Sequence, residues 1–327
     1  MWGNKMNNAI FLTQEPGHIA NVYATAPPNM QTMPLLTAPE HMPQVEFIFS
    51  TWGMPSMTED EVRRCFPALK AVFYAAGSVQ HFARAFLNSG VRVFSAWAAN
   101  AVPVAEVCLA QILLANKGFY QSAAMQKQQQ RQKAQKHTQQ QPGNFGATVG
   151  LISCGKIASH TALLLKPFDV QVLVYSNYLS EQRAAELGVT KCSLDELFAR
   201  SNTISNHLPD NEKTRGMLNY DLFKRMLPNA TFINTGRGAQ VVEADLIRAL
   251  QEEPARTAVL DVTYPEPPES DSLLYTLPNV VLTPHIAGST GRETARMGSY
   301  MLAAHADVVA GKPTPHEVTT EMLENMA

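Results

Sequence analysis

The segment 148–176, TVGLISCGKIASHTALLLKPFDVQVLVYS, constrains the fold more than any other part of the chain. It begins with a short apolar run, turns sharply at residues 153–155, and continues with apolar residues at helical spacing. A second apolar run follows at residues 170–175. This pattern predicts a βαβ unit, which needs roughly 30 residues and has two parallel strands.

The turn within this unit suits the phosphates of a dinucleotide, because a helix N-terminus directs free N–H groups and a positive dipole end at one spot. Against the fingerprint G-x-G-x-x-G, Ser153 replaces the first glycine, Gly155 keeps the second and Ala158 takes the third position. Ser176 stands where an acidic residue would bind the ribose. On this loop alone, dinucleotide binding and a purely structural turn are both open interpretations.

The size and charge of the chain narrow its class. Its 327 residues indicate two domains, and a net charge of -2 argues against a nucleic-acid partner. The start MWGNKMNNAIFLTQ lacks the features of a signal sequence and we expect no apolar run of membrane-spanning length, which predicts a cytoplasmic protein without a membrane partner. Four widely spaced cysteines without a C-x-x-C pair predict neither a disulfide framework nor a metal site.

Strand-like and helical stretches alternate along the chain. Strands are expected at residues 45–49, 70–76, 91–95, 202–207, 231–234, 258–262 and 280–283. The apolar stretch 100–120 is predicted to be a helix long enough to bridge two domains, and the glutamine-rich segment 121–141 a solvated helix. This alternation predicts an α/β fold with parallel sheets, whose ligands gather beyond the carboxyl ends of the strands.

Three chemically suitable residues follow predicted strands in the second half. Arg237 can hold a carboxylate through two parallel hydrogen bonds. His285 can exchange a proton near neutral pH, and a carboxylate such as Glu266 can fix its tautomer. Each alone has an ordinary structural explanation, but their gathering at one sheet edge beside a nucleotide loop favours a functional site.

The chain resembles the D-isomer-specific 2-hydroxyacid dehydrogenase family over nearly its whole length, from about Val45 to the C-terminal helix. Four motifs carry the resemblance: VGLISCGKIA at 149–158, SLDELFARSNTISNHLP at 193–209, LPNATFINTGRGAQVVEADLIRAL at 227–250 and LDVTYPEPPESDSLLYTLPNVVLTPHIAGST at 260–290. In addition, NAVPVAE at 100–106 resembles the family's entry into its coenzyme domain.

The resemblance implies two Rossmann-like or flavodoxin-like domains with parallel sheets, the coenzyme domain being inserted into a discontinuous substrate domain. Residues 1–99 and 291–327 would form the substrate domain, and residues 100–290 the NAD(P)-binding Rossmann domain. A homodimer formed through the coenzyme domains is also expected.

The implied reaction moves a hydride between NAD(P)(H) and C2 of a D-2-hydroxy acid or 2-oxo acid. His285 would act as general acid and base, Glu266 would orient it, and Arg237 would bind the substrate carboxylate and polarise the C2 oxygen. The residues implied in substrate binding are Gly77, Ser78, Val79, Arg237 and His285. Those implied in cofactor binding are Ser153, Gly155, Lys156, Ile157, Ser176, His207, Pro209, Thr235, Gly236, Arg237, Asp261, His285 and Gly288; no metal is implied.

Several alternatives stay open. Without an acid at Ser176 or an arginine beside it, NAD and NADP are both candidates, and we predict NAD or relaxed use of both. An inactive NAD(H)-sensing protein of the same fold and a structural α/β protein compete with the enzyme, although the proton-transfer pair favours the enzyme. Trp52 and Met54 in STWGMP indicate either an apolar substrate tail or a packed surface tryptophan.

Overall fold

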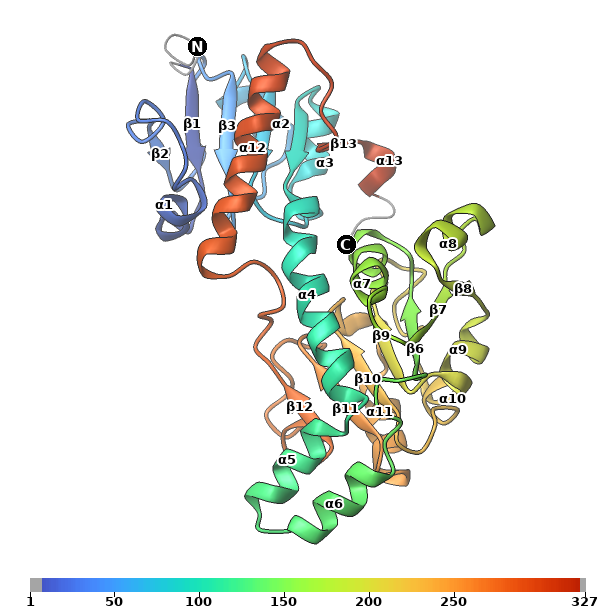
Figure 1. Cartoon of the computed structure of the whole chain (residues 1–327). Coiled ribbons are helices and arrows are strands. Elements are labelled where there is room, and N and C mark those ends of the chain that lie inside the picture. Colours follow the sequence, from blue (N-terminus) through green and yellow to red (C-terminus); the bar gives the residue numbers. More distant parts are fainter. Residues whose placement is uncertain (1–7, 324–327) are drawn as a thin grey trace. The chain divides into compact units, whose positions relative to one another are not determined.

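The computed structural model describes residues 8–323, and the chain divides into two compact units (Figure 1). Unit 1 takes in the chain up to Asn100 and from Ser289 onward, and unit 2 is Ala101–Gly288. Parts of the two terminal stretches considered above, residues 1–7 and 324–327, lie outside the described residues. The expected fold class, α/β with one unit inserted into the sequence of the other, is confirmed. The coenzyme and substrate roles of these units stay predictions.

Unit 2 is built on a seven-stranded sheet in which every pair of neighbours is parallel, in the order β12-β11-β10-β9-β6-β7-β8. Its strands are β6 Thr148–Ile152, β7 Gln171–Tyr175, β8 Thr190–Lys191, β9 Thr203–Asn206, β10 Thr231–Asn234, β11 Thr257–Leu260 and β12 Val280–Leu282. The chain order reverses between β6 and β9, as in dinucleotide-binding folds, whose ligands lie at this switch point.

Helices and apolar side chains complete unit 2. Its sheet is accompanied by α7 Lys156–Leu165, α8 Glu181–Leu187, α9 Leu194–Arg200, α10 Tyr220–Phe223 and α11 Glu243–Glu252. Helix α9 lies so close to β6 that a Cβ added to Gly150 would be 2.5 Å from Leu197 Cδ2. Two separate buried clusters, one containing Phe198 and Phe232 and the other Val149 and Val174, hold the sheet and its helices together.

Unit 1 contains a six-stranded sheet in the order β13-β5-β4-β3-β1-β2, parallel except for the pair β13 and β5. The strands are β1 Ala9–Leu12, β2 Leu35–Leu36, β3 Phe47–Ser50, β4 Ala71–Tyr74, β5 Arg92–Ser95 and β13 Glu317–Val318. Strands β1, β2 and β13 were not predicted from the sequence. Because β1 lies between β2 and β3, the strand order has the flavodoxin-like switch point between β1 and β3.

Five α-helices described in unit 1 are α1 Ile19–Val22, α2 Glu59–Cys65, α3 Ala83–Asn88, α12 Thr294–Val309 and α13 Thr320–Leu323. Helix α2 begins at the predicted cap, since the Thr58 side chain accepts a hydrogen bond from the Glu61 N–H and Glu61 bonds back to Thr58. Helix α12 runs along the sheet (Figure 1), where Met297 and Met301 are buried with Phe47 and Phe73.

The helix α4, Trp97–Ala115, continues from unit 1 into unit 2. By length and composition alone it could cross a membrane, so the expectation that no apolar run reaches this length was wrong. However, 44% of its 18-residue window is buried inside the protein. A core helix of a soluble protein passes the same test, which makes a single helix of this kind weak evidence for a membrane.

The glutamine-rich segment is not one solvated helix, as the sequence analysis expected. It forms α5 Phe119–Lys127 and α6 Arg131–Gln139, which are separated by a break where Gln129 has a φ of 62°. Gln121 is buried, and its Nε2 donates to the carbonyl groups of Ala255 and Arg256 at 3.1 Å. These carbonyl groups precede β11, so the glutamine satisfies buried backbone acceptors instead of contacting water.

Candidate active site

Three buried amide side chains fix the loop that follows β10. Asn206 Nδ2 donates to Asn234 Oδ1 at 3.0 Å and to Gln240 Oε1 at 2.8 Å. Gln240 Oε1 also accepts the N–H of Arg237 at 3.0 Å, and Asn234 Nδ2 donates to the Arg237 carbonyl group at 3.0 Å. The sequence analysis missed this network, although the position of both asparagines at strand ends is a usable signal.

The loop after β10 packs closely against the loop after β11. A Cβ added to Gly238 would lie 1.9 Å from the carbonyl carbon of Thr263, a distance that no side chain can tolerate. Glycine is therefore required where the backbone that follows Arg237 passes the segment leading to Glu266.

The Arg237 side chain is a partly buried cation. Its Nη1 donates to the Gly236 carbonyl group at 2.8 Å. Burial lowers the pKa of Arg237, while the carboxylates of Asp210 and Glu266 oppose this shift. Because an arginine side chain stays protonated in proteins, this site favours an anionic ligand that restores the solvation lost on burial.

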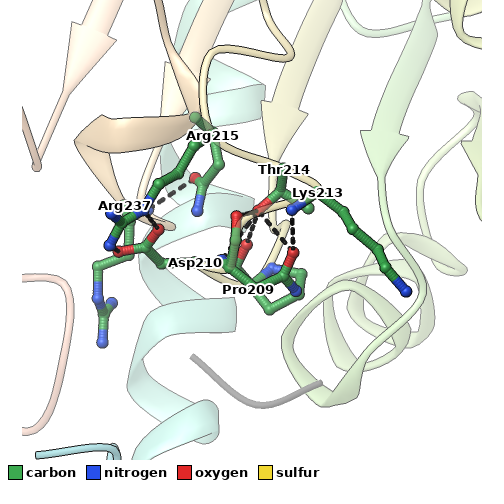
Figure 2. A network of polar contacts seen from close by, with 8 residues as sticks. Pro209, Asp210, Lys213, Thr214, Arg215 and Arg237 are labelled. Atoms are coloured by element: carbon green, nitrogen blue, oxygen red, sulfur yellow. Dashed lines mark hydrogen bonds and ion pairs between the residues drawn. The ribbon is translucent and has the colours of Figure 1, made fainter. Parts of the chain in front are cut away.

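The loop after β9 places a second arginine near Arg237. Arg215 Nε donates to Asp210 Oδ1 at 3.0 Å, so Asp210 is bound within its own loop (Figure 2). Thr214 Oγ1 donates to the Pro209 carbonyl group at 2.6 Å and closes the loop on itself. Figure 2 shows the Lys213 side chain extending away from Arg237.

His285 and Glu266 form the pair that the sequence analysis expected at this edge. His285 Nδ1 lies 2.7 Å from Glu266 Oε1, and both side chains are half-exposed. A carboxylate can only accept, so Nδ1 carries the proton and Nε2 is the nitrogen that can exchange one. His285 has a φ of 55°, a conformation that is uncommon without glycine and is often found at functional sites.

Asp261 positions the backbone on which His285 lies. Its buried carboxylate accepts from the N–H groups of Ile286 at 2.9 Å and Ala287 at 2.8 Å, and from Thr283 Oγ1 at 2.5 Å. These three bonds surround His285 and hold its strained backbone in place. The implied contact of Asp261 with the cofactor stays a prediction.

The turn after β6 has the features of an anion site. Ser153, in place of the first glycine, has a φ of 84°, and its N–H donates to the Tyr175 carbonyl group at 2.7 Å. Gly155 precedes α7 without any side-chain cap, and a Cβ added there would meet nothing within 4 Å. Lys156 opens α7, and the start of a helix directly after such a glycine turn suits a pyrophosphate.

His207 lies at the switch point of this sheet. Its N–H donates to the Ile152 carbonyl group at 3.0 Å, and burial lowers the pKa of its ring to about 4, so the ring is neutral near pH 7. Neither ring nitrogen has a hydrogen-bond partner among residues 8–323. A buried neutral imidazole without a partner fits a polar group of a bound ligand.

The other residues implied in cofactor binding are placed as follows. Ile157 packs in a small cluster with Ala287, next to Gly288, which is the last residue of unit 2. The side chains of Ser176 and Thr235 are engaged within the protein, since Ser176 Oγ accepts from the Tyr178 N–H at 3.2 Å and Thr235 Oγ1 lies 3.2 Å from Cys108 Sγ.

The implied substrate-binding residues Gly77, Ser78 and Val79 lie in unit 1, in the loop after β4. Ser95 Oγ donates to the carbonyl groups of Ala76 at 3.0 Å and Gly77 at 2.6 Å, which fixes the start of the loop. Val79 is fully buried, so at residue 79 only the backbone groups are candidates. No cluster of three or more metal-ligating side chains occurs in the described part of the chain.

Comparison with known proteins gives matches over these same motifs. The family model described as "D-isomer specific 2-hydroxyacid dehydrogenase, NAD binding domain" matches residues 109–287. D-3-phosphoglycerate dehydrogenase of Mycobacterium tuberculosis is 37% identical over 174 residues, which is 53% of this chain and 33% of that protein. Glyoxylate reductase of Aeropyrum pernix is 36% identical over 182 residues, which is 55% of this chain and 53% of that protein. The matches thus span between a third and about half of these curated relatives.

Solved structures agree with the fold over both units. D-2-hydroxyisocaproate dehydrogenase has a TM-score of 0.77 and 21% identity, covering 95% of this chain and 99% of that one. D-mandelate dehydrogenase of Rhodotorula graminis has a TM-score of 0.78 and 19% identity, covering 95% of this chain and 97% of that one. At this identity the likeness supports the two-unit architecture.

Proposed function

The chain belongs to the D-isomer-specific 2-hydroxyacid dehydrogenase family, and from this premise we propose that it transfers a hydride between NAD(H) and C2 of a D-2-hydroxy acid or the matching 2-oxo acid. The observation that carries the proposal is the 2.7 Å contact between His285 and Glu266. The charge of Glu266 also acts on the partly buried Arg237, which links this arginine electrostatically to the His285–Glu266 pair. A protein that only senses the cofactor has no use for such a proton-transfer pair.

The residues of this chain supply the proton chemistry. A bound nicotinamide cofactor would supply the hydride chemistry at C2. His285 Nε2 takes the proton of the substrate hydroxyl group, and Glu266 stabilises the resulting imidazolium through Nδ1. In the reverse direction the same nitrogen returns this proton to the C2 oxygen. Arg237 binds the substrate carboxylate and stabilises negative charge on that oxygen.

The coenzyme is proposed to lie at the switch point of unit 2. The start of α7 and the open space at Gly155 support binding of the pyrophosphate there, and the ring nitrogens of His207 would form hydrogen bonds with a ligand. Relatives named for D-3-phosphoglycerate and glyoxylate support a 2-hydroxy or 2-oxo acid as substrate. The expected homodimer and cytoplasmic location form part of the same proposal.

The test is reduction of a panel of 2-oxo acids with NADH, followed at 340 nm. We expect turnover of at least one of glyoxylate, pyruvate, hydroxypyruvate and bulkier 2-oxo acids, and we expect His285→Ala to abolish it while leaving NADH binding intact. Binding of NADH without turnover of any acid would favour the sensor instead. If neither nucleotide binds, the structural alternative is correct.

Cofactor preference gives a second measurable expectation. Residues 176 and 177 are Ser and Asn, so neither repels nor pairs with a 2'-phosphate by charge. We expect wild-type kcat/KM values for NADH and NADPH within about tenfold or in favour of NADH. Ser176→Asp should then lower kcat/KM for NADPH at least about tenfold, because its carboxylate repels the phosphate and favours a ribose hydroxyl.

The matched control for this change is Ser122→Asp, which adds the same charge on α5, and it should leave the ratio unchanged. A hundredfold wild-type preference for NADPH would refute the expected cofactor use.

A further inference from the structure

We infer that the loops after β1 and β3 of unit 1 bind the substrate beyond C2 and select an uncharged, apolar tail over a second acidic group. This inference names the substrate class of the proposed reaction and therefore rests on it. Its evidence is the juxtaposition of Trp52, His18 and Glu15 at one point of the sheet edge.

The strand order directs a ligand to this point. In an open α/β sheet, ligands bind outside the carboxyl ends of the strands where the chain order reverses, which in unit 1 is between β1 and β3. The loop with Gly77 follows β4, the next strand along the same edge. A substrate whose carboxylate binds at Gly77 would thus direct its tail toward the loops after β3 and β1.

The two loops at the switch point form one fixed structure. Thr13 Oγ1 donates to the Trp52 carbonyl group at 2.5 Å, and the Gln14 N–H donates to that of Gly53 at 2.7 Å. Gly53 has a φ of 80°, and a Cβ added to it would lie 2.8 Å from the Glu15 nitrogen. A glycine is needed there because the backbones meet so closely.

This structure holds the Trp52 ring in place. The ring packs against both core clusters of unit 1 while remaining partly exposed, and His18 lies edge-on to it with the ring centroids 5.3 Å apart. Met54, two residues later, is buried, and its carbonyl group lies 3.0 Å from His81 Nε2. A positioned aromatic face at a ligand-binding edge suits an apolar group, which favours the first of the two interpretations left open for Trp52.

The charges at this edge disfavour a second anion. The loops 13–18, 51–57 and 75–82 contain no Lys or Arg in the described structure, whereas Glu15 is half-exposed and lies 3.1 Å from His18. A substrate with a second carboxylate or a phosphate would therefore meet Glu15 without a compensating cation.

The experiment compares three 2-oxo acids with NADH and the full chain: glyoxylate, 4-methyl-2-oxopentanoate and oxaloacetate. For the wild type, kcat/KM for the branched acid should exceed that for oxaloacetate at least about tenfold. Trp52→Ala should lower kcat/KM for the branched acid about 10- to 100-fold, as expected for lost apolar contacts in a pocket. Turnover of glyoxylate, which has no tail, should change less than about threefold and shows that the variant is folded.

Two further variants sharpen the test. Trp52→Phe should restore most of the lost kcat/KM, because it keeps an aromatic face. Glu15→Arg should shift the ratio of oxaloacetate to branched acid at least about tenfold toward oxaloacetate, since it replaces a repelling charge by an attracting one. Phe145→Ala removes a ring that is 86% exposed, before β6 in unit 2, and should change neither ratio.

The outcomes separate this inference from the proposed function. A wild-type preference for oxaloacetate, or an equal loss for glyoxylate and the branched acid in a folded Trp52→Ala, would overturn the inference and leave the dehydrogenase intact. Absence of turnover with every 2-oxo acid would overturn both.

Discussion

Replacing His285 by glutamine should lower kcat about 10³-fold in both directions, within the range found for loss of a general acid or base. Glutamine keeps a polar side chain of similar size beside Glu266, which lies 2.7 Å from the ring, but it cannot exchange a proton. NADH binding, measured by fluorescence titration, should change little. Steady-state rates of 2-oxo acid reduction and hydroxy acid oxidation give the comparison.

The pH dependence of kcat/KM should have opposite directions for reduction and oxidation, which a purely structural role of His285 would not produce. His285 donates a proton to the C2 oxygen in reduction, so kcat/KM for reduction should fall as pH rises. It accepts a proton in oxidation, so kcat/KM for oxidation should fall as pH decreases. Both dependences should vanish in His285→Gln. His41→Gln, the same change at an exposed residue of unit 1, should leave them intact; an unaltered profile in His285→Gln would exclude His285 as the proton-transfer group.

Much of the fold of unit 2 could be predicted from sequence, because its strands are apolar runs bounded by turns. The segment 148–176 forms β6, α7 and β7 in the expected order. In unit 1, β1 and β2 were missed. Strand β2 has only two residues, too few for a periodic signal, whereas β1 has four, as many as the predicted β3, so its length does not explain the omission. Their pairing with β3 is long-range and depends on the assembled sheet.

The residues of the candidate site could be proposed from the sequence, but the contacts that hold them in place could not. Arg237, Glu266 and His285 follow strands, and the rule for parallel sheets was enough to place them at one edge. The left-handed backbone of Ser153 and His285 could not be predicted, because neighbouring strands and the Asp261 carboxylate impose it on residues that rarely adopt it.

The prediction for the glutamine-rich segment 121–141 was wrong for a related reason. Composition alone indicates a solvated helix, but burial of a polar residue depends on acceptors elsewhere in the chain. Gln121 Nε2 donates hydrogen bonds to the carbonyl groups that precede β11, more than 130 residues later in the sequence. No local sequence pattern reveals such a contact.

Arg237 gives the second large effect. Arg237→Gln should lower kcat/KM for any 2-oxo acid about 10³-fold, as expected when a preorganised donor for a developing oxyanion is lost. The effect should appear in kcat as well as in KM, because the guanidinium group is proposed to bind the carboxylate in the ground state and the C2 oxygen in the transition state. Arg237→Lys should recover only part of this loss, since an ammonium group keeps the charge but not the planar pair of donors.

The control for this prediction is Arg225→Gln, which removes a half-exposed arginine that lies 3.6 Å from Asp195 and should change kcat/KM less than about twofold. Thermal unfolding of each variant separates a lost ligand contact from a loss of fold. Because Asn234 and Gln240 hold the backbone of residue 237 and the Arg237 side chain adds one bond, to the Gly236 carbonyl group, Arg237→Gln should keep a near wild-type Tm. If activity instead fell only in proportion to a lower Tm, Arg237 would be a structural residue of the loop and the anion site would have to lie elsewhere along this sheet edge.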